Sequence, residues 1–161
     1  MEYEYSFKVK SHKPYIEYCE KNGYKLESDV KQQGFAFKAP NKTVARIKID
    51  IPKDGSKPKK VLDFKDEDNS KTLVKERRES LALEFEDDKA VASILEFLGY
   101  EDDGSYIRRR RVYVKGDVKF EMDYYIKSRN KVMAIEGEKE AVDKVYQEIK
   151  DIELAYGELR F

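Results

Sequence analysis

The sequence predicts an antiparallel α+β domain, and three observations lead to this fold class. Runs in which polar and apolar residues alternate, as they do in half-buried strands, outnumber the helical segments and are joined by short connections. Three segments have apolar residues at helical spacing on one side only, so we expect these helices to pack against a sheet. A strand-helix-strand-strand unit also occurs twice, its helix ending at Gly23-Tyr24 in the first copy and at Gly99-Tyr100 in the second.

Start and stop signals place the three helices. The first is predicted between Ser11 and Gly23, with Pro14 in its first turn, and the second between Asp87 and Gly99. The third is predicted over about 139–154, with apolar residues on one stripe. The sequence Lys115-Gly116-Asp117 separates two alternating runs, which is typical of a hairpin.

The strand-like runs carry charge on one face. Arg46 and Lys48 alternate with Ala45, Ile47 and Ile49, and successive side chains of a strand point to opposite faces of the sheet. If the charged faces converge, they line a site for a polyanion. The charged residues that follow this pattern are Glu2, Glu4, Lys8, Arg46, Lys48, Lys65, Arg78, Arg108 and Arg110.

Length and composition narrow the possible classes of protein. The 161 residues suit a single domain over 1–161, and 33 basic residues balance 33 acidic ones, so no net charge attracts the chain to nucleic acid or to a membrane. With no signal peptide and no apolar span, a cytoplasmic protein is expected. One cysteine, Cys19, and one histidine, His12, make no His/Cys metal site, so a metal held by carboxylates, Mg²⁺ or Mn²⁺, is favoured.

An ordered series of short motifs over residues 2 to about 150 resembles the CYTH superfamily, the triphosphate tunnel metalloenzymes. The series is Glu2-x-Glu4, Arg46-x-Lys48, Leu62-Asp63-x-Lys65, Arg78, Leu98-Gly99-Tyr100, Arg108-x-Arg110-x-x-Tyr113, Met122-Asp123 and Ile135-Glu136-Gly137. The family includes class IV adenylyl cyclases, thiamine triphosphatases and inorganic tripolyphosphatases. The resemblance implies a closed antiparallel β-barrel of about eight strands, with a charged tunnel inside and helices packed outside.

The resemblance also implies the roles of individual residues. Six cations would grip a triphosphate, whose oxygens suit charge-assisted bonds from guanidinium groups: Arg46, Lys48, Lys65, Arg78, Arg108 and Arg110. Glu2, Glu4 and Glu136 would hold Mg²⁺ or Mn²⁺, with Asp123 as a further contributor. In this family an activated water hydrolyses the triphosphate, or a ribose hydroxyl attacks it to form a cyclic nucleotide.

The chain departs from the family pattern at four positions. Ser6 stands where the family has a lysine, and Lys8, on the same face, is the candidate catalytic replacement. Ser80, Ala82 and Ala134 stand where the family places glutamates. These changes weaken the prediction of turnover more than the prediction of triphosphate binding.

Three functions remain open from the sequence. The first is metal-dependent hydrolysis of inorganic tripolyphosphate or an organic triphosphate, with adenylyl cyclase-like activity on ATP as a variant. The second is a catalytically degenerate module that binds nucleotide or polyphosphate. The third is an RNA-binding barrel that uses Arg108 to Arg111, which the zero net charge disfavours. The expected partner is a small-molecule triphosphate, and neither a membrane nor a nucleic acid is expected.

Overall fold

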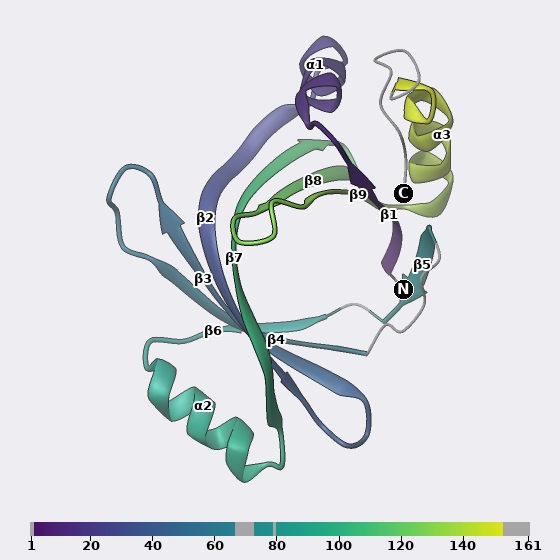
Figure 1. Ribbon diagram of the computed structural model, residues 1–161. Helices are drawn as coiled ribbons and strands as arrows, with labels where there is room; N and C mark the ends of the chain where they lie inside the picture. The colour runs from purple at the N-terminus through teal and green to yellow at the C-terminus, as the bar shows by residue number, and fades with distance from the viewer. Residues whose placement is uncertain (1, 67–72, 79, 153–161) are drawn as a thin grey trace. The chain divides into compact units, whose positions relative to one another are not determined.

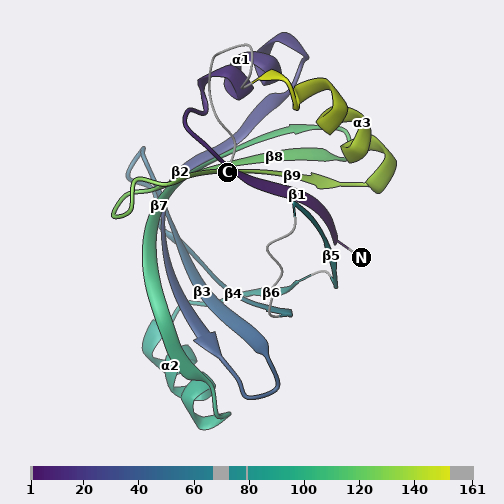
Figure 2. The ribbon, with the colours of Figure 1, turned by 45° about the vertical axis from the view of Figure 1, so that its right-hand side comes forward.

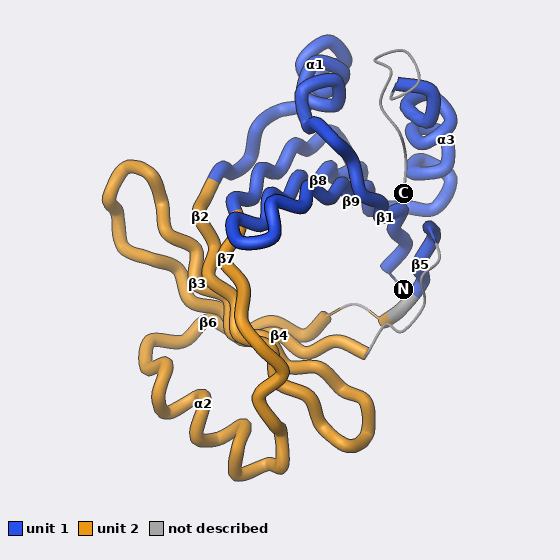
Figure 3. Tube along the Cα trace, in the orientation of Figure 1, with its two compact units in different colours: residues 1–29, 70–77, 109–161 blue, residues 30–69, 78–108 orange. Residues whose placement is uncertain are grey.

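The computed structural model describes residues 2–66, 73–78 and 80–152. The chain forms two compact units, and each is built from separate stretches of sequence (Figure 3). Unit 1 comprises residues 1–29, 70–77 and 109–161, and unit 2 comprises residues 30–69 and 78–108. The prediction of a single domain over 1–161 stays a prediction.

Nine strands and three helices are present in the described residues. In chain order they are β1 (Glu2–Val9), α1 (Lys13–Lys21), β2 (Lys25–Lys38), β3 (Thr43–Pro52), β4 (Lys59–Asp66), β5 (Val74–Arg77), β6 (Leu81–Glu84), α2 (Asp88–Phe97), β7 (Glu101–Lys115), β8 (Val118–Tyr125), β9 (Lys131–Gly137) and α3 (Lys139–Ile149). The predicted duplication is confirmed in this order, since β1-α1-β2-β3 recurs as β6-α2-β7-β8.

In unit 1 the strand order is β5-β1-β9-β8, followed by the parts of β7 and β2 that belong to this unit. The pairs β1–β5, β1–β9 and β8–β9 are antiparallel. Helices α1 and α3 lie over one face of these strands (Figure 2). Phe120, Met133 and Ile135 are fully buried beneath them, together with Tyr15 of α1 and Val142 of α3.

In unit 2 the strand order is β7-β2-β3-β4-β6, with the parts of β7 and β2 that belong to this unit, and α2 lies beside these strands (Figure 1). The pairs β2–β3, β3–β4 and β4–β6 are antiparallel. Leu95 of α2 is buried in one cluster with Ala45, Ile47, Ile49 and Leu62. This confirms that the odd-numbered residues of β3 face the core, which places Arg46 and Lys48 on the other face of the strand. The antiparallel α+β class is therefore confirmed, with nine strands in place of about eight, and closure of the sheet into a barrel stays a prediction.

The helices were expected to cover the apolar side chains of the strands, but those of β6 are exposed. Leu81 is 76% exposed and Leu83 is 59% exposed, because α2 reaches β3 and β4 instead. Both side chains remain on the surface of unit 2.

The helix ends follow the predicted signals. Gly23 and Gly99 both have positive φ, at +79° and +89°, which a residue without a Cβ adopts without strain. The next backbone N–H in each case, that of Tyr24 or Tyr100, donates to a carbonyl five residues back. The predicted hairpin is confirmed as the turn between β7 and β8. Helix α3 ends at Ile149, short of the predicted end near residue 154, which lies outside the described residues.

Candidate functional site

The sheet of unit 1 has a polar face opposite its core. Across the β1–β9 pair, Glu4 lies opposite Glu136, Ser6 opposite Ala134, and Lys8 opposite Val132. Residues paired across antiparallel strands share a face. The same rows continue onto β8, where the partners of Glu136, Ala134 and Val132 are Lys119, Glu121 and Asp123. We call the surface made by these residues and Glu2 the polar face of unit 1.

Three carboxylates gather at one end of this polar face. One oxygen from each of Glu2, Glu4 and Glu136 lies within 4.8 Å of the others, and the Glu4 side chain is buried. Burial, followed by the negative charges of Glu121 and Glu2, raises the pKa of Glu136 to about 7. Crowded, partly desolvated carboxylate oxygens are a donor set that fits Mg²⁺ or Mn²⁺, so these residues fit the metal that the sequence predicts.

Asp123 lies apart from these three carboxylates. It stands two rows from Glu136 and accepts hydrogen bonds from Nε and Nη2 of Arg110 at 2.7 and 2.8 Å. The Nη1 atom of the same guanidinium lies 2.8 Å from Glu121. Arg110 is thus held on the polar face between two acids, and the metal role predicted for Asp123 has no support from its position.

Glu121 is a site residue that the sequence reasoning missed. Its signal was its spacing, since it alternates with Lys119 and Asp123 in the run that forms β8. Lys119 also belongs to the site, with its ammonium 3.8 Å from Glu136. The candidate catalytic Lys8 is exposed and shares its row with Asp123.

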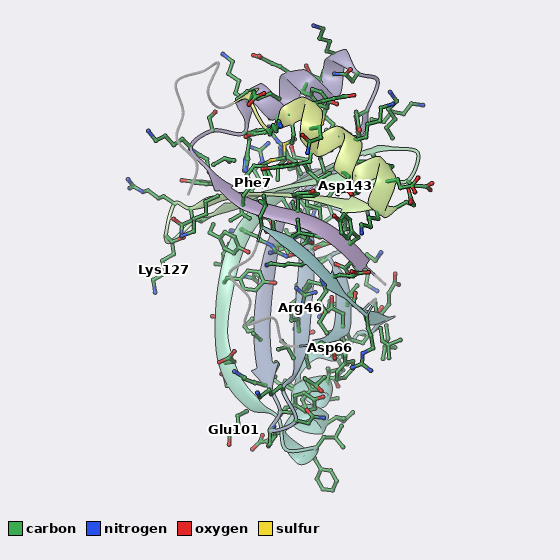
Figure 4. All side chains as sticks on the ribbon, turned by 90° about the vertical axis from the view of Figure 1, so that its right-hand side faces the viewer. Phe7, Arg46, Asp66, Glu101, Lys127 and Asp143 are labelled. Atoms are coloured by element: carbon green, nitrogen blue, oxygen red, sulfur yellow. The ribbon has the colours of Figure 1, made fainter. Side chains whose placement is uncertain are left out.

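In unit 2 the cations of β3 gather around one buried carboxylate. Arg46 donates from Nε and Nη2 to both oxygens of Asp63 at 2.8 Å each, and the Lys48 ammonium lies 2.7 Å from Asp63. Figure 4 shows Arg46 on its strand. Burial acts to raise the pKa of Asp63, but the bonds and charges of Arg46 and Lys48 outweigh it and hold that pKa below its usual range. Lys65, which lies opposite Val44, points to the same face.

Arg108 is buried on unit 2 and oriented by a chain of polar contacts. Its Nε and Nη2 donate to Oε1 of Gln32 at 2.8 and 2.5 Å, and the amide of Gln32 donates to Asp50 at 2.7 Å. The guanidinium carbon lies 4.7 Å from the ring centroid of Tyr106. That ring covers Gly34, where an added Cβ would come within 2.0 Å of it. The sequence reasoning missed Gln32 and Gly34, because their place opposite Asp50 and Lys48 depends on the register between β2 and β3.

Arg78 differs from the other predicted triphosphate ligands. It follows the end of β5, its side chain is 76% exposed, and its guanidinium pairs with Asp66. Asp66 neighbours Lys65 on β4 and therefore points to the face opposite Lys65. The structure thus brings Arg46, Lys48 and Lys65 to one face of unit 2 and leaves Arg78 on its surface.

Comparison with solved structures shows that other proteins have this fold. Protein PH1012 from Pyrococcus horikoshii OT3 is 20% identical, with 91% of this chain and 88% of that chain covered and a TM-score of 0.73. A candidate adenylate cyclase from Vibrio parahaemolyticus is 14% identical, with coverages of 92% and 83% and a TM-score of 0.67. HpAC1 from Hippeastrum, a candidate adenylyl cyclase with a dominant triphosphatase activity, is 16% identical, with coverages of 94% and 88% and a TM-score of 0.66.

Neither a family model nor a curated protein matches the sequence. The likeness to these solved structures, each at most 20% identical, shows a shared fold. No helix in the described part of the chain is long and apolar enough to cross a membrane.

Proposed function

We propose that this protein binds a triphosphate together with Mg²⁺ or Mn²⁺ and hydrolyses it. The observation that carries the proposal is the group of three carboxylates, Glu2, Glu4 and Glu136, next to a guanidinium held on the same face. Acids and cations on one face are the chemistry that a metal-bound polyphosphate needs. The fold shared with a protein whose dominant activity is triphosphatase supports the same reaction class.

The three carboxylates would hold the metal, which when bound polarises a phosphate oxygen and lowers the pKa of a bound water. Arg110 on unit 1 would pair with a phosphate oxygen in place of one of its two acids. For unit 2, the CYTH resemblance implies that Arg46, Lys48, Lys65 and Arg108 would bind phosphate oxygens. Arg78 would take part only after leaving Asp66.

The side chains that accept hydrogen bonds from these cations set their geometry before a ligand binds. Asp63 fixes the guanidinium of Arg46 and the ammonium of Lys48, and the amide oxygen of Gln32 fixes the guanidinium of Arg108. Side chains that are already oriented lose less conformational entropy on binding. We therefore assign Asp63 and Gln32 positioning roles.

A non-catalytic binding module is the second candidate, and one observation favours it. Ser6 and Ala134, two of the departures from the family pattern, lie opposite each other on β1 and β9. One row of the polar face thus lacks both the lysine and the glutamate that the family has there. Phosphate binding tolerates the loss of charged groups better than turnover does, because turnover requires the reacting groups to be held in one geometry.

A substrate panel separates the possibilities. Tripolyphosphate, ATP and thiamine triphosphate are each incubated with Mg²⁺ and with Mn²⁺, and phosphate, pyrophosphate and cyclic nucleotide are measured. The proposal predicts metal-dependent release of phosphate. Cyclic AMP with pyrophosphate would instead show cyclase activity, and tight binding without any product would establish the binding module.

A further inference from the structure

A cavity of about 480 Å³ lies on the helix-covered side of unit 1. It is formed where β7, β8 and β9 meet α1, and four cations line it: Lys13, Arg109, Arg111 and Lys131. Arg109 and Arg111 alternate with Arg110 along β7, so they point away from the polar face that carries the carboxylates. The cavity is therefore separate from the proposed triphosphate site of unit 1.

The two arginines of this cavity are held by a single acid. Arg109 donates from Nε and Nη2 to Asp29 at 2.9 and 2.8 Å, and Nε of Arg111 donates to the same carboxylate at 3.2 Å. Each guanidinium has five N–H donors, so both retain donors beyond those that Asp29 accepts. Among the described residues, Glu17 is the one acid that lines the cavity. Glu17 and Asp29 together carry two negative charges, fewer than the four positive charges of the cations.

The rest of the cavity wall is apolar and aromatic. Ile16, Met122 and Tyr124 line it, and the Lys131 ammonium lies 5.7 Å from the centre of the Tyr124 ring. His12 is also part of the wall, with its Nε2 atom 3.1 Å from the carbonyl oxygen of Val132. Oriented cations beside an aromatic surface suit an anion that carries a flat organic group.

We propose that this cavity binds a phosphate monoester with a flat ring. Arg109 and Arg111 bind the phosphate through charge-assisted hydrogen bonds, and the ring lies against Tyr124 and Met122. The volume falls in the range of small-molecule sites, which is roughly 300 to 1,000 Å³. This proposal goes beyond the proposed function, because it concerns a second ligand on the opposite face of the sheet.

The test is calorimetric titration of the full chain with adenosine 5′-monophosphate (AMP), in EDTA and in saturating tripolyphosphate. EDTA removes the metal and with it any metal-dependent turnover, and AMP binding in the cavity needs neither a metal nor a triphosphate, so the result does not depend on the proposed function. AMP is expected to bind, while adenosine and inorganic phosphate, each of which lacks one half of the ligand, bind at least about tenfold more weakly.

Arg111→Gln is expected to weaken AMP binding about tenfold or more, since it removes a charged donor. Tyr124→Ala should bring the affinity for AMP close to that for inorganic phosphate. Lys127→Gln is the matched control, because Lys127 is an exposed cation of unit 1 outside the cavity and its loss should leave AMP binding unchanged.

Circular dichroism checks that each variant folds. If Arg111→Gln does not fold, the exposed Lys13 is replaced by Gln, with a smaller loss of affinity expected. Three results would overturn the proposal: no binding of AMP, displacement of AMP by tripolyphosphate, or equal AMP affinity in the folded cavity variants and the wild-type protein.

Discussion

Glu136 carries a carboxyl group whose pKa rises to about 7 through burial and through the charges of Glu121, Glu2 and Glu4, while Lys119 opposes the shift. In the unfolded chain this carboxyl has an ordinary pKa near 4.5. Between pH 4.5 and about 7, the carboxyl group of Glu136 is therefore protonated in the metal-free folded protein and ionised in the unfolded chain. Stability falls as pH rises through this window, because ionised Glu136 adds to a cluster of like charges.

Glu136→Gln should remove this dependence, because an amide cannot ionise. In EDTA the variant is expected to match the wild-type stability near pH 4.5 and to exceed it above pH 7, by up to about 3 kcal/mol. Urea unfolding at both pH values measures the difference, with the exposed Glu27→Gln as the control. An equal effect of Glu136→Gln at both pH values would show that burial and the neighbouring charges do not raise the pKa of Glu136.

Ser6 lies beside the carboxylates on β1, opposite Ala134 and two residues from Glu4. Serine offers a hydroxyl that donates one hydrogen bond, whereas a lysine adds a full charge. In the same row of the polar face, Glu121 of β8 lies beside Ala134 on the side away from Ser6. A lysine at position 6 would therefore enter a row that already contains an acid and lacks a cation.

Ser6→Lys is expected to raise kcat for triphosphate hydrolysis, since the new ammonium stabilises charge on the phosphate. Lys8→Ala tests the other explanation, in which Lys8 has replaced the missing lysine. A gain in the first variant with no change in the second supports a weakened site, and loss in the second alone supports a relocated lysine. Lys144→Ala is the control for an exposed cation on helix α3, away from the polar face, and its kcat should not change.

The strand β7 shows how far alternation along an element predicts function. Arg108 and Arg110 were predicted to follow one alternating pattern, and they do point away from Arg109 and Arg111. Their partners could not be predicted, because Gln32 and Asp29 lie on another part of the chain. A period of two gives the face of a residue but not the register that brings it beside another strand.

Strand β2 requires a glycine at position 34, and the sequence reasoning missed this requirement. Gly34→Ala would place a Cβ within 2.0 Å of the Tyr106 ring, so the ring must move and the guanidinium of Arg108 loses its stacking partner. We expect a stability loss of about 1 to 3 kcal/mol, typical of overpacking, and weaker triphosphate binding.

Thermal unfolding and calorimetric titration with tripolyphosphate measure these two effects. Adding Tyr106→Ala to Gly34→Ala removes the clash, so the loss caused by Gly34→Ala should be smaller in this background than in the wild type. The same loss in both backgrounds would show that the Tyr106 ring is not what restricts position 34.

At the scale of the whole molecule, the sequence predicted the class of fold and the repeated order of elements because both follow from local patterns. The helix ends at Gly23 and Gly99 and the alternating faces of β1, β3 and β7 needed no tertiary information. The division into two compact units was not predicted, because it depends on pairings between distant segments. Arg78 was grouped with the cations of the charged strand faces for the same reason, since the end of β5 at Arg77 is not marked in the sequence.

The central claim is that Glu2, Glu4 and Glu136 hold a metal that drives triphosphate hydrolysis. The most direct measurement is phosphate release from tripolyphosphate in Mn²⁺ by the wild-type protein, by Glu4→Gln and by the control Glu27→Gln, each repeated in EDTA. We expect the wild type and Glu27→Gln to release phosphate only with metal, and Glu4→Gln to lose at least about a hundredfold in rate while staying folded. Release that continues in EDTA, or a Glu4→Gln protein as active as the wild type, would contradict the claim.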